Sequence, residues 1–381
     1  MSTIPFHVPD LDDAERDAVL AALAAGQLSG DGELCQRAEA RLGELTGAGH
    51  VLLVTSATHA LELALLTLGV GPGDEVLVPS FAYPSNANSI LLRGATPVFV
   101  DVSEDTLDLD PDDAESVVSE RTVAVMPIDY GGVGCDVLGL KARLSATAGR
   151  DIAVVQDSAH GFLSSRDGQH LGTASDFGVL SFHVTKNIVS GEGGALFIKD
   201  DALAAHAEII REKGTNRAAF LRGEVDFYEW CEMGSSYGLS DLLASILLVQ
   251  LDKAAALTER RRRIVARYDA ELADVFERGL LRPQIIPDNC QANGHLYPLR
   301  TDDPGSCKAL RGHLAEAGIT APFHFVPLHS AAYARKHLGT PRNLPVTDRI
   351  WNTLLRLPVY PRLTDEEQGR VIAATRSGVG L

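Results

Sequence analysis

The sequence predicts an α/β protein in which a mostly parallel sheet forms a large domain, followed by a smaller α/β domain. Three observations support this prediction. Residues 50–200 alternate short β-rich runs with helical stretches, which indicates parallel strands joined by helical crossovers. The strand-like runs are continuously apolar, as in strands buried on both faces. At 381 residues the chain is too long for one small core and fits a large domain plus a smaller one.

The expected elements of the large domain follow one another closely. Strands are predicted at 50–55, 75–80, 96–102, 122–130, 151–157 and 177–183, and another strand follows the glycine-rich stretch SGEGG. Helices are predicted at 59–69, 85–95 and 139–149. The runs are rich in Val, Ile and Leu, and turns such as GVGPGDE punctuate them.

A long helix with room for one break is predicted at 239–277, and its charged second half suggests a connector between domains. Residues 280–381 combine short strands such as HLYPLR, proline-marked loops and a closing helix after Thr364. We therefore expect a large domain with the N-terminal segment at 1–250, and a connector helix with the small domain at 251–381.

Composition excludes several function classes. The net charge of -17 repels phosphate backbones, which argues against nucleic acid as a partner. Five scattered cysteines without a C-x-x-C pair indicate a reduced compartment and no metal site. The N-terminus lacks the pattern of a signal peptide, and no apolar stretch is long enough to span a membrane. We expect a cytoplasmic protein.

Polar residues at strand ends are the first candidates for a site, because ligands of open parallel sheets bind beyond the carboxyl ends of the strands. Asp157 ends the apolar run DIAVVQD. Such a carboxylate can cap a helix or form a turn. It can equally serve as partner of a protonated pyridine nitrogen, which a pyridoxal phosphate (PLP) cofactor requires as an electron sink. The residue alone leaves both interpretations open.

Lys186 follows the predicted strand 177–183 and precedes the glycine-rich turn. A lone lysine in a loop is usually solvated. This one lies between two apolar strands, where burial would lower its pKa and make it a nucleophile for Schiff-base chemistry. The glycines would let the backbone pass close to a ligand.

Thr55, Ser56 and Thr58 lie between a predicted strand and the start of a helix. A helix N-terminus with hydroxyl groups and free N–H groups can bind phosphate. An ordinary N-cap would use the same residues, so this signal is weak by itself.

Together these segments resemble the DegT/DnrJ/EryC1/StrS family of sugar aminotransferases, which are fold-type I PLP enzymes. The sharpest motif is SFHVTKNIVSGEGGAL, and VPSFAYPSNANSILLRGATPVFVDV and VVQDSAHG are also close to the family pattern. The resemblance covers nearly the whole chain, and the motifs occur in the expected order.

The resemblance implies a role for each matching residue. Lys186 would hold the cofactor and shuttle a proton between cofactor and substrate, and Asp157 would pair with the ring nitrogen. The remaining cofactor contacts implied by the resemblance are Tyr83 against the ring, His160 near the 3-hydroxyl, and Ser181 with the turn Ser56, Ala57 and Thr58 at the phosphate. His183 lies in the motif without an implied role. Tyr83 could also be a core residue.

Within the family, the segments GQLSGDG, EIIREKGTNRAAFLRGEVDFYEW, MGSSYGLSDLLAS and FHFVPLHS are most similar to transaminases that make dTDP-4-amino-4,6-dideoxyhexoses. These enzymes use dTDP-4-dehydro-6-deoxyglucose and L-glutamate, and the cofactor alternates between PLP and pyridoxamine phosphate. Many relatives carry Asn where this chain has Ser236, and that Asn reaches the cofactor phosphate of the neighbouring subunit. The shorter Ser236 either loses this contact or makes it through water, and the nearer transaminases share the serine.

Further residues are candidate substrate contacts. Lys213 and Arg217, together with Arg211, suit a nucleotide diphosphate, but they could equally be solvated cations at a helix end. His329 could lie near the sugar, and loop packing would explain it almost as well. The family also implies a homodimer with shared active sites.

Several alternatives stay open at this point. Amination at C3 rather than C4, a UDP-linked rather than a dTDP-linked sugar, and galacto or gluco stereochemistry are not encoded in the motifs. A related class of pyridoxamine-dependent sugar dehydratases carries histidine in place of the lysine, and Lys186 argues against that class. A regulatory protein without chemistry would be expected to lack Lys186 or Asp157, and both are present.

Overall fold

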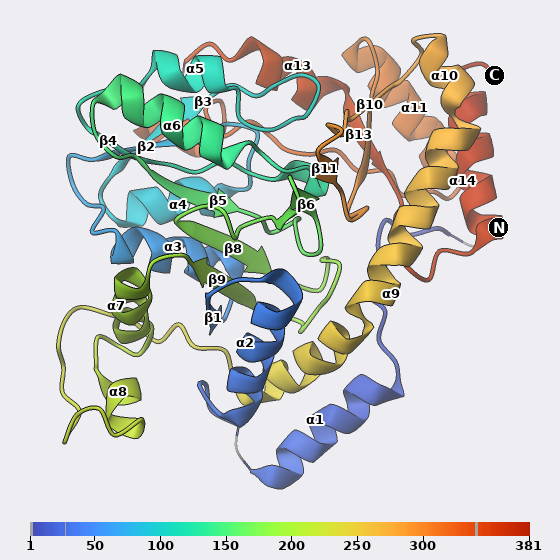
Figure 1. The fold of residues 1–381 in the computed structure, drawn as a ribbon. Coiled ribbons are helices and arrows are strands. Elements are labelled where there is room, and N and C mark those ends of the chain that lie inside the picture. The colour runs from blue at the N-terminus through green and yellow to red at the C-terminus, as the bar shows by residue number, and fades with distance from the viewer. Residues whose placement is uncertain (1–2, 27, 340–341) are drawn as a thin grey trace.

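The computed structural model describes residues 3–26, 28–339 and 342–381 (Figure 1). Gln27, part of the segment GQLSGDG, and Met1 and Ser2, part of the N-terminus judged free of a signal peptide, lie outside the described residues. Across the described ranges, every helix is too short or too polar to cross a membrane.

A seven-stranded sheet with strand order β1-β9-β8-β5-β4-β2-β3 forms the centre of the large domain. Its strands are β1 His50–Val54, β2 Glu75–Pro79, β3 Thr96–Val100, β4 Thr122–Val125, β5 Ala153–Asp157, β8 Phe177–Ser181 and β9 Gly194–Ile198. The pairs from β8 to β3 are parallel, and only β9 runs against its neighbours β8 and β1. The loop 182–193 contains no crossover helix, so β9 can only turn back beside β8. The predicted mostly parallel sheet is confirmed.

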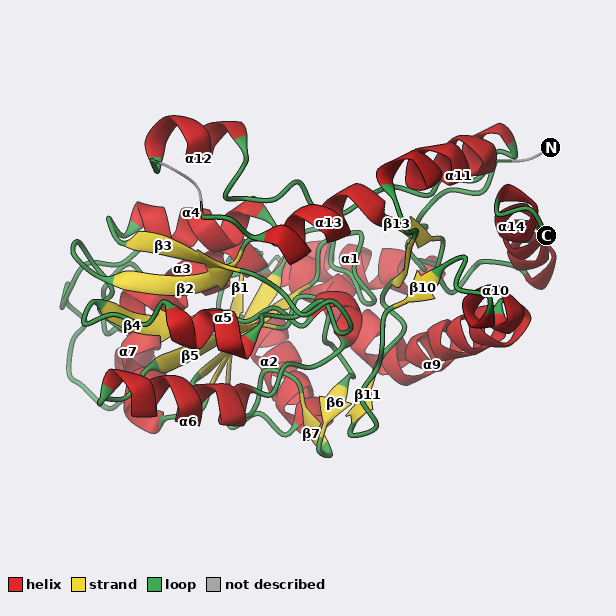
Figure 2. Cartoon of the chain, turned by 90° about the horizontal axis from the view of Figure 1, so that it is seen from above, coloured by secondary structure: helices red, strands yellow, loops and turns green. Residues whose placement is uncertain are grey.

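Helices cover both faces of this sheet (Figure 2). In β2, Val76 and Val78 point to a core shared with α3 and α7, whereas Leu77 points to a core shared with α5 and α6. This alternation is the period of a strand, and both faces are apolar because both are covered. The helices of the large domain are α2 Glu33–Thr46, α3 Ala57–Thr67, α4 Pro84–Leu92, α5 Pro111–Ser116, α6 Val137–Ala148, α7 Asp201–Arg211, α8 Arg217–Leu221 and the 3₁₀ turn Tyr130–Gly132.

The helix α9, Asp241–Glu271, runs from the large domain to the small one (Figure 1). Its first half packs with α1 (Asp13–Ala25) and α2, and its second half contributes Ile264 and Tyr268 to the core of the small domain. The short α10, Ala273–Glu277, follows after Leu272, so the predicted long helix with one break is confirmed. The proposed domain boundary at residue 250 falls inside α9 and stays a prediction.

The small domain is built around a three-stranded antiparallel sheet, β10-β12-β13. Its strands are β10 Arg282–Pro283, β12 Tyr297–Arg300 and β13 Leu354–Leu357, and its helices are α11 Pro304–Glu316, α12 Ala332–His337, α13 Pro345–Thr353 and α14 Asp365–Gly378. The closing helix begins at the predicted place, because Thr364 and Glu367 form a capping box. A further small sheet pairs β6 Ser165–Arg166 with β7 Gln169–His170 and β11 Cys290–Gln291.

A buried charge cluster ties α7 to the N-terminal part of the large domain. Arg211, 2% exposed, lies 2.7 Å from the Glu39 carboxylate and 2.6 Å from that of Asp31. It also donates a hydrogen bond to the Leu53 carbonyl in β1. Burial raises the pKa of the Glu39 carboxyl in spite of the guanidinium beside it. The pair is therefore costly to break, because either charge would be left desolvated alone.

We expect Arg211→Ala to lower the free energy of unfolding by about 3–5 kcal/mol, because Glu39 would remain buried without its partner. The matched control is Arg222→Ala. Arg222 pairs with Glu208 and Glu224 with its side chain about half exposed, and its loss should cost less than about 1 kcal/mol. Urea unfolding of both variants measures the difference, and equal losses would contradict the assignment of the buried cluster.

Candidate active site

A cleft of about 540 Å³ opens at the carboxyl ends of β5 and β8. The large domain forms one wall, and β13 with the loops around 295 and 324 forms the other. Eight of the residues predicted from the sequence line this cleft: Ser56, Ala57, Thr58, Tyr83, Asp157, His160, Ser181 and Lys186. Ser56 and Lys186, which are 130 positions apart in the sequence, thus line the same cavity.

Lys186 lies in the turn that follows β8, where its backbone N–H donates to the His183 carbonyl. Burial in the cleft wall lowers the pKa of Lys186 to about 8, an effect that the Asp157 carboxylate opposes and Arg356 reinforces. The neutral amine, which is the nucleophilic form, is therefore far more populated near neutral pH than in a solvated lysine. Burial of the Lys186 side chain in the cleft wall is thus the structural cause of its lowered pKa, as the sequence led us to expect.

Asp157 ends β5 and is 8% exposed. Its Oδ2 accepts a 2.7 Å hydrogen bond from the side chain of Asn86 in α4, and its Oδ1 accepts from the Ala159 N–H at 3.0 Å. Asn86 is 1% exposed. Two donors thus hold the carboxylate in place at the cleft. Asn86 stands in the motif FAYPSNAN, but the sequence analysis assigned it no role.

The N-terminus of α3 forms another part of the cleft wall. The Ser56 hydroxyl accepts from the His59 N–H at 3.2 Å, so Ser56 is the N-cap that the sequence also allowed. The Thr58 hydroxyl lies 2.7 Å from that of Ser85. In the glycine-rich turn, a Cβ at Gly194 would come within 2.6 Å of the Ala57 backbone nitrogen. Glycine at this position lets β9 lie against the start of the helix, with helical N–H groups and hydroxyls facing the cleft.

His160 and Tyr83 complete the predicted set. Burial, Lys186 and a second histidine, His324, hold the pKa of His160 well below its usual range, so the ring is neutral. Its Nδ1 accepts a hydrogen bond from the Gly131 N–H, and its ring lies 4.3 Å from that of His295. Tyr83 precedes α4 and is 62% exposed on the cleft wall. A core role for Tyr83 is therefore ruled out by its exposure.

The structure places four predicted residues away from the cleft of the single chain. Ser236 pairs with Glu212 through the backbone, and Lys213 lies 3.3 Å from the Glu212 carboxylate. Arg217 begins the short α8. His329 is buried, with its Nδ1 2.7 Å from the Ser80 hydroxyl, which is the loop-packing alternative considered for it.

The opposite wall carries residues that the sequence analysis did not select: Phe6, His295, His324, Phe325 and Arg356. His324 and Phe325 belong to the segment FHFVPLHS, but the resemblance implied no role for either, and Phe6 and His295 stand in segments without a recognised motif. The exception is Arg356, a charged residue inside the apolar stretch LLRLPVY. A charge in a run that reads as buried strand is a signal that could have been used.

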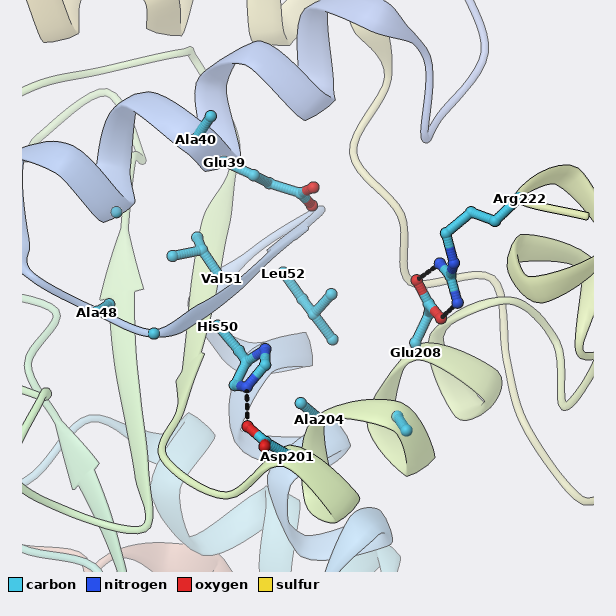
Figure 3. Close-up of a pocket in the computed structure, with 13 residues that line it drawn as sticks. Glu39, Ala40, Ala48, His50, Val51, Leu52, Asp201, Ala204, Glu208 and Arg222 are labelled. Carbon is cyan, nitrogen blue, oxygen red and sulfur yellow. Dashed lines mark hydrogen bonds and ion pairs between the residues drawn. The ribbon is translucent and has the colours of Figure 1, made fainter. Parts of the chain in front are cut away.

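A second cavity, of about 570 Å³, lies between α2, β1 and α7 (Figure 3). It includes His50, which begins β1, and therefore lies at the amino end of that strand, at the opposite edge of the sheet from Lys186. Its polar side chains already have partners, since His50 contacts Asp201 at 2.7 Å and Arg222 pairs with Glu208. The larger volume alone does not make it the reactive site.

The cleft residues fit pyridoxal phosphate. A buried carboxylate suits the ring nitrogen, a lysine of lowered pKa suits the aldehyde, and a helix N-terminus with hydroxyls suits the phosphate. A parallel sheet covered on both faces, with these groups at its carboxyl edge, has the architecture of fold-type I PLP-dependent enzymes.

Comparison with known proteins narrows this class. Residues 9–376 match the model of the DegT/DnrJ/EryC1/StrS aminotransferase family. The spore coat polysaccharide biosynthesis protein SpsC of Bacillus subtilis is 33% identical, over 98% of this chain and 96% of its own. The aminotransferase TlmJ of Streptoalloteichus hindustanus is 33% identical with a TM-score of 0.90, over 99% of both chains.

The putative sugar aminotransferase Spr1654 of Streptococcus pneumoniae, solved in PLP and PMP forms, is 30% identical with a TM-score of 0.90, over 99% of this chain and 98% of its own. The chain belongs to the DegT/DnrJ/EryC1/StrS aminotransferase family. The predictions of this family, of the fold class and of a PLP-dependent sugar aminotransferase are confirmed.

Asp157 raises the pKa of Lys186 by its negative charge, so Asp157→Asn should move that pKa below about 8. The pH dependence of acetylation of Lys186 in the cofactor-free protein, followed by peptide mass spectrometry, measures the shift. The control is Asp167→Asn, an exposed carboxylate that is not part of the cleft. An unchanged midpoint in Asp157→Asn would contradict the electrostatic coupling of the two residues.

Proposed function

We propose that this protein moves an amino group from L-glutamate to C4 of dTDP-4-dehydro-6-deoxy-D-glucose, giving a dTDP-4-amino-4,6-dideoxyhexose of galacto or gluco configuration. The observation that carries the chemistry is the meeting of Lys186 and Asp157 in one cleft beside the N-terminus of α3. The choice of sugar is supported by the sequence segments shared with transaminases of this substrate. Amination at C3, or of a UDP-linked sugar, is the alternative that product analysis would reveal.

In this proposal, the chain's residues divide the work around the cofactor. When bound, pyridoxal phosphate supplies an electron sink that stabilises negative charge at the carbon bearing the amino group. Lys186 would hold the cofactor through its amine, and the same amine, when free, would accept and return the proton that moves between donor and cofactor. Asp157, fixed by Asn86, keeps a proton on the ring nitrogen. Holding the cofactor and carrying the proton both need the Lys186 amine to lose and regain a proton. A pKa of about 8 allows this near neutral pH.

The remaining predicted residues would hold and orient the cofactor. Ser56, Ala57, Thr58 and Ser181 would bind the phosphate, and Tyr83 would lie against the ring. His160 is neutral, so it can donate one hydrogen bond to the 3-oxygen without adding a positive charge next to Lys186. This arrangement leaves the lysine amine as the group that titrates during the cycle.

We also propose that the residues outside the single-chain cleft act in a homodimer. Ser236, Lys213 and Arg217 lie on the stretch 212–236, which also exposes large apolar side chains: Leu221, Phe227, Tyr228, Trp230 and Met233. Such a concentration of exposed apolar surface marks a contact region. A second subunit covering it would bring Ser236 to the partner's cofactor phosphate and the two cations to the nucleotide diphosphate. His329 stays a candidate sugar contact, although in the single chain it is buried against the Ser80 hydroxyl.

The function is tested by incubating the protein with PLP, L-glutamate and dTDP-4-dehydro-6-deoxyglucose and recording the proton NMR spectrum of the product. We expect a 4-amino sugar, with the ring couplings at C4 distinguishing galacto from gluco. Lys186→Ala should lower turnover by at least about a thousandfold, because the proton carrier is lost. Lys199→Ala, an exposed lysine outside the cleft, serves as control. A 3-amino product, or no amine from this sugar, would overturn the assignment of the substrate.

The dimer is tested by sedimentation. We expect the native protein to sediment as a dimer at micromolar concentration. Two charges placed in the exposed stretch, Phe227→Glu with Trp230→Glu, should weaken association by roughly a hundredfold or more, because each ring loses its apolar burial. Leu280→Glu changes a partly exposed apolar residue of the small domain and should leave the dimer intact. A native monomer with full activity would contradict the proposal.

A further inference from the structure

His295 stands two residues before β12 and brings a second imidazole ring to the cleft beside His160. It is 7% exposed and lines the same cavity as Lys186. The ring centres of His295 and His160 lie 4.3 Å apart. Asn293 is fully buried and links the two residues, because its Oδ1 accepts from the His295 N–H and its Nδ2 donates to the His160 carbonyl. Backbone contacts thus fix this pair of histidines at the cleft.

Hydrogen bonds at Nδ1 give the two rings opposite tautomers. The Gly131 N–H donates to Nδ1 of His160, so the proton of that neutral ring is on Nε2. Nδ1 of His295 lies 2.7 Å from Oδ1 of Asn187, an atom that can only accept, so His295 carries its proton on Nδ1. Burial holds the pKa of His295 well below its usual range, and this ring is therefore neutral as well. Nε2 of His295 presents a lone pair.

This lone pair has no hydrogen-bond partner among the described residues. The ring of His170 shows the contrast, because it accepts from the Leu163 N–H at Nε2 and contacts the Leu171 carbonyl at Nδ1. Nδ2 of Asn187 is also without a partner, but that atom is sealed from solvent. Nε2 of His295 is not sealed in this way, since the ring lines the cleft. It is therefore open to a hydrogen-bond donor that enters the cleft.

The surroundings of Nε2 select the kind of group that it can bind. A carboxylate has no proton to donate. An ammonium group would be repelled by Lys186 and Arg261, whose positive charges act on the His295 ring. A hydroxyl group donates a proton and carries no charge, so it has neither disadvantage. The keto sugar carries hydroxyl groups, whereas the amino donor L-glutamate has none.

We propose that His295 binds a hydroxyl group of the keto sugar through Nε2, and that Asn187 is the positioning residue that keeps the proton of His295 on Nδ1. The proposal rests on the proposed function, which supplies the sugar. Asn187 directly follows Lys186 in the chain. The turn that carries the reactive amine therefore also sets the acceptor, and it serves the sugar as well as the cofactor.

The tautomer is tested by NMR of the protein labelled with nitrogen-15 histidine, in which the ring nitrogen shifts show where the proton is. The signals of His295 are those that disappear in His295→Gln. We expect a protonated Nδ1 in the native protein. Asn187→Leu should move the proton to Nε2, the form that neutral histidine prefers in water, because the acceptor at Nδ1 is lost. Asn352→Leu, a change at an exposed asparagine of α13, should leave the signals of His295 unchanged.

A native protein with the proton of His295 on Nε2 would overturn the proposal. This result needs no variant at Asn187, so the test holds even if Asn187→Leu does not fold.

The hydroxyl contact is tested with dTDP-6-deoxyglucose, which lacks the keto group and binds without turnover. In calorimetric titration of the holoenzyme, His295→Phe should weaken its binding roughly three- to tenfold, the range of one neutral hydrogen bond. His295→Gln, whose amide oxygen can take the place of Nε2, should restore most of the affinity. Binding of dTDP alone should be the same in all three proteins. His337→Phe, an exposed histidine of α12 outside the cleft, is the matched control.

Sugar analogues that lack the 2-hydroxyl or the 3-hydroxyl identify the group that is bound. One of them should bind the native protein roughly three- to tenfold more weakly and should lose no further affinity in His295→Phe. Normal binding of dTDP-6-deoxyglucose by His295→Phe, or an equal loss of affinity for dTDP alone, would overturn the proposal.

Failure of the proposed function gives a different result. If L-glutamate bleaches the cofactor's visible absorption but the native protein binds no dTDP-6-deoxyglucose, the proposed sugar is wrong. The NMR signals of His295 then still decide whether the cleft presents this acceptor.

Discussion

The parallel pairing of β5 with β8 is the constraint on which the site depends. Asp157 lies opposite Val179 in this pair, so both strands end at the same edge of the sheet. The turn after β8 then brings Lys186 to the cleft that Asp157 also lines. Because both strands are buried on both faces, a slip of register would move side chains into the opposite core and disrupt the close packing on both sides of the sheet. The same packing that holds the sheet together therefore also fixes Asp157 and Lys186 at the cleft.

The cleft concentrates buried charge, and this sets its electrostatics. Lys186 and Arg356 each depress the affinity of neighbouring histidines for protons, so His160 and His324 stay neutral. Asp157 works in the opposite direction on Lys186. Without that carboxylate, burial beside another cation would leave the amine uncharged over a wider pH range, and proton return to it would be harder. The balance between Asp157 and Arg356 thus sets how readily the Lys186 amine gains and loses a proton.

Sequence patterns predicted the strands and the motif residues, which depend on neighbouring positions in the chain. They missed the residues that distant segments bring to the cleft only in the folded protein. The apolar runs identified the strands because a doubly covered sheet leaves no room for polar alternation, and the motif around Lys186 identified one wall of the cleft. His295, His324 and Arg356 belong to the other wall, where single residues from separate loops and a strand meet only after the small domain packs. Ser236, Lys213 and Arg217 show the converse, because the family pattern pointed to them while the single chain holds them outside the cleft.

The two histidines of FHFVPLHS show why residue type alone could not settle the site. His329 binds the Ser80 hydroxyl and is sealed in the loop, whereas His324, five positions earlier, stacks on Phe325 and faces the cleft. Both are buried or nearly so, and both look equally suited to catalysis in the sequence. Each ring has a hydrogen-bond partner, the Ser80 hydroxyl for His329 and the Tyr130 hydroxyl for His324, and what separates them is that only His324 lines the cleft. Ser80 follows β2, so the partner of His329 comes from a strand end 249 residues earlier in the chain. Position relative to the cleft, which only the folded chain reveals, therefore separates two histidines that look alike in the sequence.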